Sequence, residues 1–203
     1  MTSQNSPGSL IVFEGTDGTG KSTQLDLLHS VLQDKGFEVV ATREPTEGMY
    51  GRQIRDLYNN RKKLSLNEEL ELFLADRKEH IDTLVTPALA SGKIVLCDRY
   101  YLSTVAYQGA AGLDPSDILK RNNFAPVPDL ALLLYAPIQT GVERITKGRG
   151  DTLNDFEKED YLQKVARQFE QLTLPCIRRI NASASIDAVH RTVLNHVLQL
   201  LEK

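Results

Sequence analysis

The fold of this chain is decided by one stretch near its beginning, Gly15-Thr16-Asp17-Gly18-Thr19-Gly20-Lys21-Ser22. The stretch fits the pattern G-x-x-x-x-G-K-[ST] of a phosphate-binding loop. Residues 10–14 before it predict a buried strand, and the apolar spacing after it predicts an amphipathic helix. A strand, a glycine-rich turn and a helix in this order direct backbone N–H groups at one point, which suits a polyphosphate. The eight residues, together with Thr23 behind them, are the predicted phosphate contacts.

The residues of this loop have separate tasks. Gly15 and Gly20 allow backbone angles and a close approach that a side chain would block. Lys21 can reach the outer phosphates as a point charge, and the Ser22 hydroxyl can ligate magnesium. The alternative is a glycine-rich turn that matches by chance, but the strand before it and the helix after it favour a true phosphate loop.

The composition indicates one globular α/β domain that acts on small molecules. The chain has 203 residues, of which 41% are hydrophobic. It carries 24 basic and 27 acidic residues, so we expect no broad positive surface for nucleic acid or for an anionic membrane. Cys97 and Cys176 form no C-x-x-C pair, which favours buried thiols in a reduced compartment. Residues 1–9 resemble neither a signal peptide nor a membrane span, so a cytoplasmic protein is expected.

Short β-rich runs alternate with helical patterns along the whole chain. The expected strands are residues 10–14, 38–42, 94–98, 130–135 and 177–181. This alternation predicts a five-stranded, mostly parallel sheet with helices on both faces.

Helix signals lie between and after these strands. Ser65 and Glu68 match a capping box, Asp114-Pro115 offers an N-cap followed by a proline, and Pro137 opens a further helix. The apolar spacing of residues 186–201 predicts a last helix that docks on the sheet. The four histidines form no metal-ligand pattern in the sequence.

Two charged residues end the third predicted strand. An acidic residue at the carboxyl end of such a strand faces the crevice where ligands bind, so Asp98 is expected near the metal. Arg99 could clamp phosphoryl oxygens with two hydrogen bonds and neutralise charge during transfer. The alternative is a surface ion pair at a strand end, which the phosphate loop in the same sheet disfavours.

The helix that begins at Ser65 carries an arginine on its apolar stripe. Phe73 and Arg77 are four residues apart and therefore share one face, which brings an aromatic plane and a fork of donors into the same space. That pair suits a planar base, with the ring stacking and the guanidinium bonding its carbonyl edge. The alternative is a core Phe73 beside an Arg77 that reaches solvent or pairs with a carboxylate.

Further basic residues follow the second and fourth strands. Arg43 could present its charge to the same crevice. The alternative is that it lies in an ordinary loop that leaves the second strand and has no role in binding. Arg144, Lys147 and Arg149 lie on or beside a glycine-punctuated segment that could close over a nucleotide and exclude water. We expect this lid to cover about residues 146–156; the alternative is a solvated basic loop.

Several blocks of sequence together resemble those of bacterial thymidylate kinases. These blocks are Phe13-Glu14-Gly15, Arg43-Glu44-Pro45, Leu72-Phe73-Leu74-Ala75-Asp76-Arg77, and Asp98-Arg99-Tyr100 through Ser103-Thr104-Val105-Ala106-Tyr107-Gln108-Gly109. The resemblance covers nearly the whole chain. It implies a single P-loop nucleoside monophosphate kinase domain over residues 1–203, with residues 1–8 as a flexible start. It also implies a homodimer that transfers the γ-phosphoryl group of Mg-ATP to dTMP.

The resemblance also assigns roles to single residues. It implies that Asp17 bonds the sugar 3′-hydroxyl, that Phe73 stacks on thymine and that Arg77 bonds its O4 edge. It implies that Thr104 and Tyr107 shape the pocket that admits deoxyribose.

One position departs from part of this family. Some members have an arginine inside the phosphate loop where this chain has Gly18, so the transition-state arginine is expected from the lid. Arg149 is the first candidate and Arg144 the second.

Two other functions are open to a chain with this loop. A deoxynucleoside kinase would phosphorylate thymidine itself, and the arginines expected near the acceptor, Arg99 and Arg43, disfavour it. A GTP-dependent switch would read guanine through an N-K-x-D element, which this sequence lacks. The leading hypothesis is therefore a dTMP kinase that uses ATP and Mg²⁺.

Overall fold

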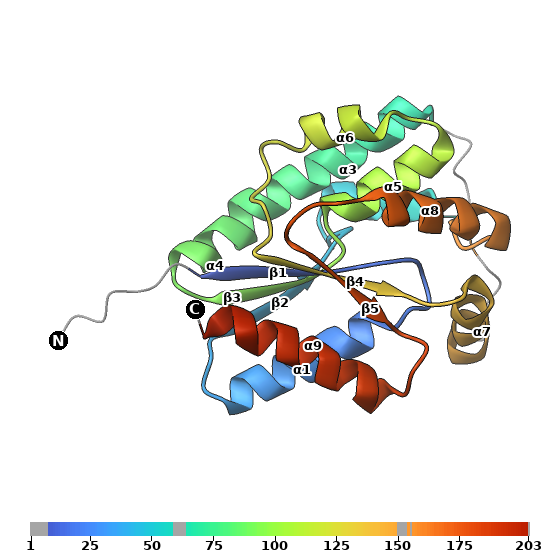
Figure 1. Ribbon diagram of the computed structural model, residues 1–203. Helices are drawn as coiled ribbons and strands as arrows, with labels where there is room; N and C mark the ends of the chain where they lie inside the picture. Colours follow the sequence, from blue (N-terminus) through green and yellow to red (C-terminus); the bar gives the residue numbers. More distant parts are fainter. Residues whose placement is uncertain (1–7, 59–63, 150–153, 155, 203) are drawn as a thin grey trace.

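The computed structural model describes residues 8–58, 64–149, 154 and 156–202, without the side chains of Gly148 and Arg149. Within these residues, every strand pair of the five-stranded sheet is parallel, and the strand order is β2-β3-β1-β4-β5 (Figure 1). The strands are β1 (Ser9–Glu14), β2 (Val39–Arg43), β3 (Ile94–Asp98), β4 (Leu130–Tyr135) and β5 (Ile177–Asn181). The predicted α/β fold with a five-stranded sheet is confirmed. The largest difference is that β2 is shifted by one residue toward the C-terminus.

Helices cover both faces of this sheet. They are α1 (Lys21–Asp34), α2 (Met49–Asp56), α3 (Leu66–His80), the π-helical η2 (Ile81–Val85), α4 (Thr86–Ala90), α5 (Tyr101–Ala111), α6 (Pro115–Arg121), α7 (Ile138–Arg149), α8 (Glu159–Gln171) and α9 (Ile186–Leu201). Among the described residues, no helix combines the length and the apolar character needed to cross a bilayer.

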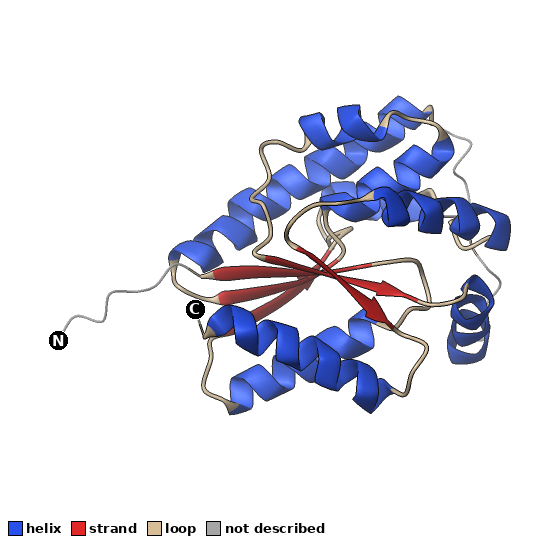
Figure 2. Ribbon diagram, viewed as in Figure 1, coloured by secondary structure: helices blue, strands red, loops and turns tan. Residues whose placement is uncertain are grey.

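The two faces of the sheet bury different side chains. Ile11 and Phe13 of β1 pack in a core with α1 and α9, which lie together below the sheet in Figure 2. Leu10 and Val12, which alternate with them, belong to the core under α5 and α8 on the opposite face. A strand buried on both faces is expected to be apolar throughout, because successive side chains point to opposite sides.

Local signals start several helices where the sequence predicts them. Ser65 and Glu68 form both hydrogen bonds of a capping box at α3, and Asp114 caps α6 ahead of Pro115. The last helix docks through Val189, Val193 and Val197 as its spacing predicts. Ile186 departs from that stripe and is 58% exposed, because it lies in the first turn, beyond the edge of the sheet core.

The parallel sheet brings its functional segments to one edge. Phe13 of β1 and Arg43 of β2 both stand opposite Asp98 of β3, so the segments that follow these strands begin side by side. The carboxyl edge of a parallel sheet is where ligands bind in open α/β folds. The candidate site is therefore expected at the start of α1 and α5.

Candidate active site

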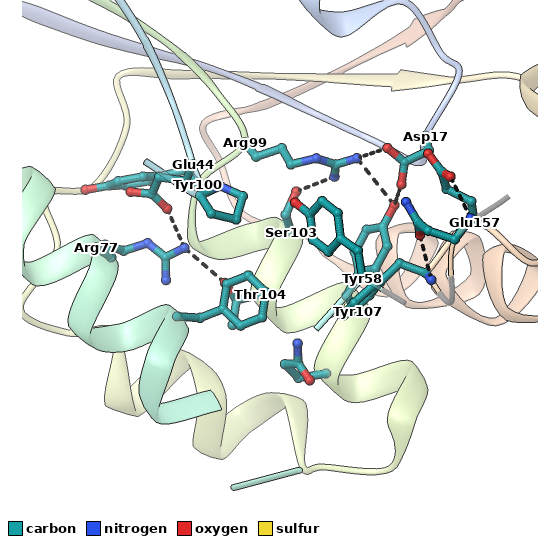
Figure 3. Close-up of a pocket in the computed structure, with 15 residues that line it drawn as sticks. Asp17, Glu44, Tyr58, Arg77, Arg99, Tyr100, Ser103, Thr104, Tyr107 and Glu157 are labelled. Carbon is teal, nitrogen blue, oxygen red and sulfur yellow. Dashed lines mark hydrogen bonds and ion pairs between the residues drawn. The ribbon is translucent and has the colours of Figure 1, made fainter. Parts of the chain in front are cut away.

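Two cavities meet at this edge of the sheet, and Asp17 and Arg99 line both of them. One cavity, of about 450 Å³, follows the phosphate loop from Asp17 to Gln24 and also contains Asp98 and Arg144. The other, of about 220 Å³, lies between α3 and α5 and contains Phe73 and Arg77 (Figure 3). A site of this form can hold two ligands that face each other across the Asp17–Arg99 pair.

The phosphate loop has the backbone that its glycines predict. Gly15 has φ 133°, and a Cβ atom there would lie 2.1 Å from the carbonyl oxygen of Leu134. Lys21 is buried, and its Nζ donates to the Thr16 carbonyl at 2.9 Å. Burial, aided by the charge of Arg99, lowers the pKa of Lys21 to about 8. The loop thus holds a largely desolvated cation beside backbone donors, which suits a polyphosphate.

Ser22 and Asp98 form an oxygen-rich corner of the same cavity. The Ser22 hydroxyl donates to Asp98 Oδ2 at 2.5 Å. The other carboxylate oxygen, Oδ1, is buried and has no hydrogen-bond partner among the described residues. Hydroxyl and carboxylate oxygens are the protein ligands that Mg²⁺ prefers. These residues therefore fit a magnesium ion at the phosphate loop.

The start of α7 lies directly on the phosphate loop. A Cβ atom on Gly18 would lie 2.2 Å from the carbonyl oxygen of Gly141, and one on Gly141 would lie 2.7 Å from that of Asp17. One turn further along α7, Arg144 donates to the carbonyls of Gly18 at 3.4 Å and Ala182 at 3.1 Å. The contact between two glycines therefore brings the Arg144 guanidinium to the phosphate cavity.

The other two basic residues considered for the lid, Lys147 and Arg149, lie in the last turn of α7. Lys147 is exposed and pairs with Glu143 at 3.2 Å on the same helix. Arg149 ends α7, and its side chain lies outside the described part of the chain, as do residues 150–153 and 155 of the lid. Among the described lid side chains, Arg144 is the arginine that contacts the loop.

Asp17, Arg99 and Tyr107 form a bonded group between the cavities (Figure 3). Arg99 Nη2 lies 2.7 Å from Asp17 Oδ1, and the Tyr107 hydroxyl donates to Asp17 Oδ2 at 2.6 Å. Burial acts to raise the pKa of Asp17, but the charges of Arg99 and Lys21 outweigh it and lower the pKa to about 2. Burial raises the pKa of Tyr107 well above its usual value, so the phenol stays a donor.

Arg77, on α3, is 1% exposed and lines the cavity between α3 and α5. Its Nη2 donates to Glu44 Oε2 at 2.6 Å and to Thr104 Oγ1 at 3.0 Å, and its Nη1 donates to Asn122 at 2.7 Å. Its Nε–H has no partner among the described residues. Arg77 therefore pairs with a carboxylate, as one interpretation expects, and it also lines the cavity, where the binding of a planar base stays a prediction.

Aromatic side chains line the rest of this cavity. Phe73 lies on the wall next to Arg77 along α3, as their spacing predicts. The ring of Phe156 lies 5.6 Å from that of Tyr58 and 6.3 Å from that of Tyr107. Phe156, at the end of the expected lid, therefore packs over the end of the cavity that contains Asp17.

The structure does not bring Arg43 to either of these cavities. Its side chain is 66% exposed and pairs with Glu47 at 2.7 Å. It lines a separate surface hollow beside His80 and Thr83 instead. Its predicted contact with the acceptor has no support in this geometry.

One histidine joins a buried cluster that the sequence pattern did not indicate. His80, Glu44 and Cys97 offer ligand atoms within 4.8 Å of one another. His80 Nδ1 is 3.0 Å from Glu44 Oε1, and its Nε2 is 2.8 Å from Thr42 Oγ1. Because Arg77 occupies the other oxygen of Glu44, the carboxylate is already bonded on both sides. The cluster thus acts as a support that fixes the guanidinium of Arg77.

Several cavity residues escaped prediction from the residue pattern. They are Tyr58, Ser103, Gln108, Asn154, Phe156 and Glu157. Ser103 and Gln108 lie in the block that follows Asp98, and their spacing along α5 places them near Tyr107. Tyr58 and Phe156 come from segments whose approach to α5 depends on the whole chain path, and nothing in their local sequence distinguishes them.

Comparison with known proteins gives a consistent result. A family model described as thymidylate kinase matches residues 13–193 of the chain. A protein named thymidylate kinase from Desulfotalea psychrophila is 59% identical over 198 residues, which cover 98% of each chain. Proteins of the same name from Xanthomonas euvesicatoria pv. vesicatoria and Xanthomonas campestris pv. campestris are 47% and 46% identical over 192 residues. Those residues cover 94% of this chain and 84% of each relative.

Proposed function

The chain belongs to the thymidylate kinase family, and from this we propose how its residues carry out the reaction. The enzyme is a dTMP kinase: it transfers the γ-phosphoryl group of ATP to the 5′-phosphate of dTMP, which yields dTDP and ADP. The observation that carries the assignment of roles is that the two cavities share Asp17 and Arg99. The phosphate-loop cavity takes ATP, and the cavity between α3 and α5 takes dTMP.

The phosphate loop and Thr23 bind the donor. Backbone N–H groups of the loop and the buried Lys21 surround the β- and γ-phosphates, and Arg144 approaches from α7. Ser22 and Asp98 would hold Mg²⁺. Bound there, the ion neutralises charge on the phosphate oxygens.

The other cavity selects the acceptor base. The Phe73 ring stacks on thymine, and the fixed guanidinium of Arg77 donates to its O4 carbonyl. Cytosine presents an amino group at that edge, which would face the Arg77 donors and leave them without an acceptor. The hydrogen bond from Arg77 to Thr104 holds the side of the cavity that faces the base.

The junction of the cavities orients the acceptor for in-line transfer. Asp17 accepts a hydrogen bond from the sugar 3′-hydroxyl, and the Tyr107 side chain bounds the cavity on that side of the sugar. Arg99 clamps the acceptor phosphate and stabilises charge as the γ-phosphoryl group moves. The ion pair with Asp17 supports this role, because it holds the guanidinium between both cavities. A contribution from Arg43 would require its side chain to leave Glu47.

The lid is proposed to supply the transition-state arginine. If Arg149 has this role, Arg149→Ala should lower kcat by about 1,000-fold and change the Kd for ATP little, because the contact forms mainly during transfer. Single-turnover rates and ATP binding measured in Arg149→Ala, Arg144→Ala and Lys147→Ala separate the candidates. Unchanged turnover in Arg149→Ala would transfer the role to whichever of the other two variants is slow.

The remaining proposals concern the whole chain. We propose one domain over residues 1–203 with a lid at about residues 146–156, a homodimer, no nucleic-acid or membrane partner, and a cytoplasmic location. The near balance of 24 basic and 27 acidic residues supports small-molecule substrates over nucleic acid.

The base cavity is tested by an acceptor screen. ADP release is measured in a coupled assay with dTMP, dUMP, dCMP, dGMP and thymidine, each with ATP. We expect dTMP to give the highest kcat/KM and thymidine, which lacks the 5′-phosphate, to give negligible turnover. A higher kcat/KM for dCMP or thymidine would contradict the proposed roles of Arg77 and Arg99, respectively.

A further inference from the structure

We infer that Glu14, a buried carboxylate at the end of β1, is a positioning residue that holds Arg99 between the two cavities. The inference rests on the role proposed for Arg99 above. The backbone of Arg99 has φ 71°, which lies in the left-handed region. Among the described residues it is the one non-glycine residue with a positive φ. Such a conformation is strained in a residue that has a side chain, and it persists only where surrounding contacts fix it.

The end of β1 supplies those contacts. The Arg99 backbone N–H donates to the Phe13 carbonyl at 2.9 Å, and the next N–H, of Tyr100, donates to Glu14 Oε1 at 3.0 Å. The second oxygen of Glu14 accepts from the Ser103 hydroxyl in the first turn of α5. The end of the neighbouring strand β1 therefore holds the left-handed turn at Arg99, directly through Phe13 and Glu14 and by way of Ser103 in α5.

Ser103 connects Glu14 to the guanidinium itself. Arg99 Nη1 donates to Ser103 Oγ at 3.1 Å, while the hydroxyl proton of Ser103 goes to Glu14. This order makes Ser103 an acceptor toward Arg99, and Figure 3 shows the two side chains meeting. Glu14 thereby sets the direction of the Ser103 hydroxyl, which helps to place the Arg99 guanidinium together with the Gly15 carbonyl and Asp17.

Glu14 has no direct role in the proposed chemistry. It is 0% exposed and is not among the residues that line the two cavities. Burial raises its pKa to about 7, although the Ser103 hydrogen bond and the charges of Arg99 and Arg77 partly oppose the rise. A buried carboxylate with a raised pKa lowers the stability of a folded protein. Its presence is therefore better explained by the placement of Arg99 than by stability.

The test compares Glu14→Gln with the matching carboxylate-to-amide change at Asp129, whose side chain bonds the N-terminal part of β1. Asp129 Oδ2 accepts from the Leu10 N–H at 2.8 Å, and Asp129 is not among the residues that line either cavity, so Asp129→Asn serves as the control. Glutamine can still accept from Tyr100, but its amide donates toward Ser103 and reverses that hydroxyl. At pH 8, where Glu14 is mostly ionised, we expect kcat for dTMP to fall by about 10- to 100-fold, the cost of a small misplacement, while the KM for ATP stays constant. Asp129→Asn should keep the wild-type kcat.

A double-mutant cycle shows whether Glu14 acts through Arg99. In an Arg99→Lys background, Glu14→Gln should cause no further loss of kcat, and Glu14→Gln alone should keep or raise the thermal midpoint. The inference would be overturned if the kcat losses of Glu14→Gln and Arg99→Lys multiplied in the double variant. It would also be overturned if the kcat loss of Glu14→Gln came with a lower thermal midpoint. A wild-type kcat in Glu14→Gln would overturn it as well. If Arg99→Lys is itself fully active, the proposed role of Arg99 fails, and the positioning role of Glu14 fails with it. If Arg99→Lys is slow but Glu14→Gln is fully active, only the inference about Glu14 is refuted, and the proposed role of Arg99 stands.

Discussion

Arginine is tolerated in the interior at position 77 because three oxygen acceptors bind its Nη1 and Nη2 groups and the guanidinium also lies 5.4 Å from the centre of the Tyr100 ring. Glu44 neutralises its charge at 2.6 Å, and Asn122 and Thr104 take two further N–H groups. His80 in turn holds the other oxygen of Glu44. A buried pair of this kind adds little to stability by itself, but losing one partner leaves a charge without compensation.

Replacing Arg77 should therefore affect both stability and selectivity. Arg77→Met is expected to lower the free energy of unfolding by about 3–5 kcal/mol, because Glu44 stays buried without its partner. It should also reduce the preference for dTMP over dCMP. Urea unfolding and the acceptor assay measure the two effects.

A matched surface pair provides the control for this prediction. Arg121 pairs with the exposed Glu71, and Arg121→Met should cost about 1 kcal/mol or less. Adding Glu44→Gln to Arg77→Met should restore part of the lost stability, because it removes the uncompensated charge. Equal costs for Arg77→Met and Arg121→Met would contradict the account of a buried pair.

The raised pKa of Glu14 predicts a pH dependence of stability. Its pKa is about 7 in the folded protein against an ordinary 4.5, so between these values the folded state keeps a proton that the unfolded state releases. Its contribution to stability is therefore largest below pH 4.5 and is lost as the pH rises to about 7. Relative to wild type, Glu14→Gln should gain about 3 kcal/mol between pH 4 and pH 8. A difference between the two unfolding free energies that does not change with pH would refute this.

Among the elements, α7 has the tightest contact with the site. Its first turn approaches the phosphate loop so closely that neither Gly18 nor Gly141 has room for a side chain. An arginine at position 18 would not fit in this structure, because α7 occupies the space next to Gly18. The same contact sets the position of Arg144 one turn later.

A methyl group at Gly141 should disturb this arrangement. In Gly141→Ala the new Cβ would lie 2.7 Å from the Asp17 carbonyl, so α7 must move outward and carry Arg144 with it. We expect kcat to fall on the order of 100-fold, because a displacement of about 1 Å near reacting groups has that effect. Gln139→Ala, an exposed residue of the same helix, is the control and should keep the wild-type rate. If Gly141→Ala has a normal kcat, Arg144 does not depend on this contact.

The elements also show which parts of the fold the residue pattern could predict. The strands and the capped starts of α3 and α6 depend on neighbouring residues and were predicted correctly. The helix expected to begin at Ser65 is not continued as a regular α-helix, because the π-helical η2 follows α3 and precedes Pro87. Proline cannot donate to the preceding turn, and a wider turn accommodates the change in hydrogen bonding.

At the scale of the whole molecule, the parallel sheet assembles the site from distant segments. The phosphate loop, Arg77 and Arg99 follow or lie between different strands, yet they meet at one edge because β1, β2 and β3 all end there. This edge also joins the two cavities, so the sites proposed for ATP and dTMP share Asp17 and Arg99. The end of the expected lid adds Phe156 to the wall of the cavity between α3 and α5.

The sequence by itself determined the phosphate loop, the α/β sheet, the family and the face shared by Phe73 and Arg77. These features depend on short-range spacing, which the order of residues contains directly. Only the tertiary structure decided that Arg43 turns to Glu47, that Arg144 contacts the loop and that Glu14 supports Arg99. Those contacts join residues of separate elements, and side-chain direction there follows from how the elements pack. The packing of β1 against β3 and of α7 against the loop is therefore the physical reason for the final arrangement of charges.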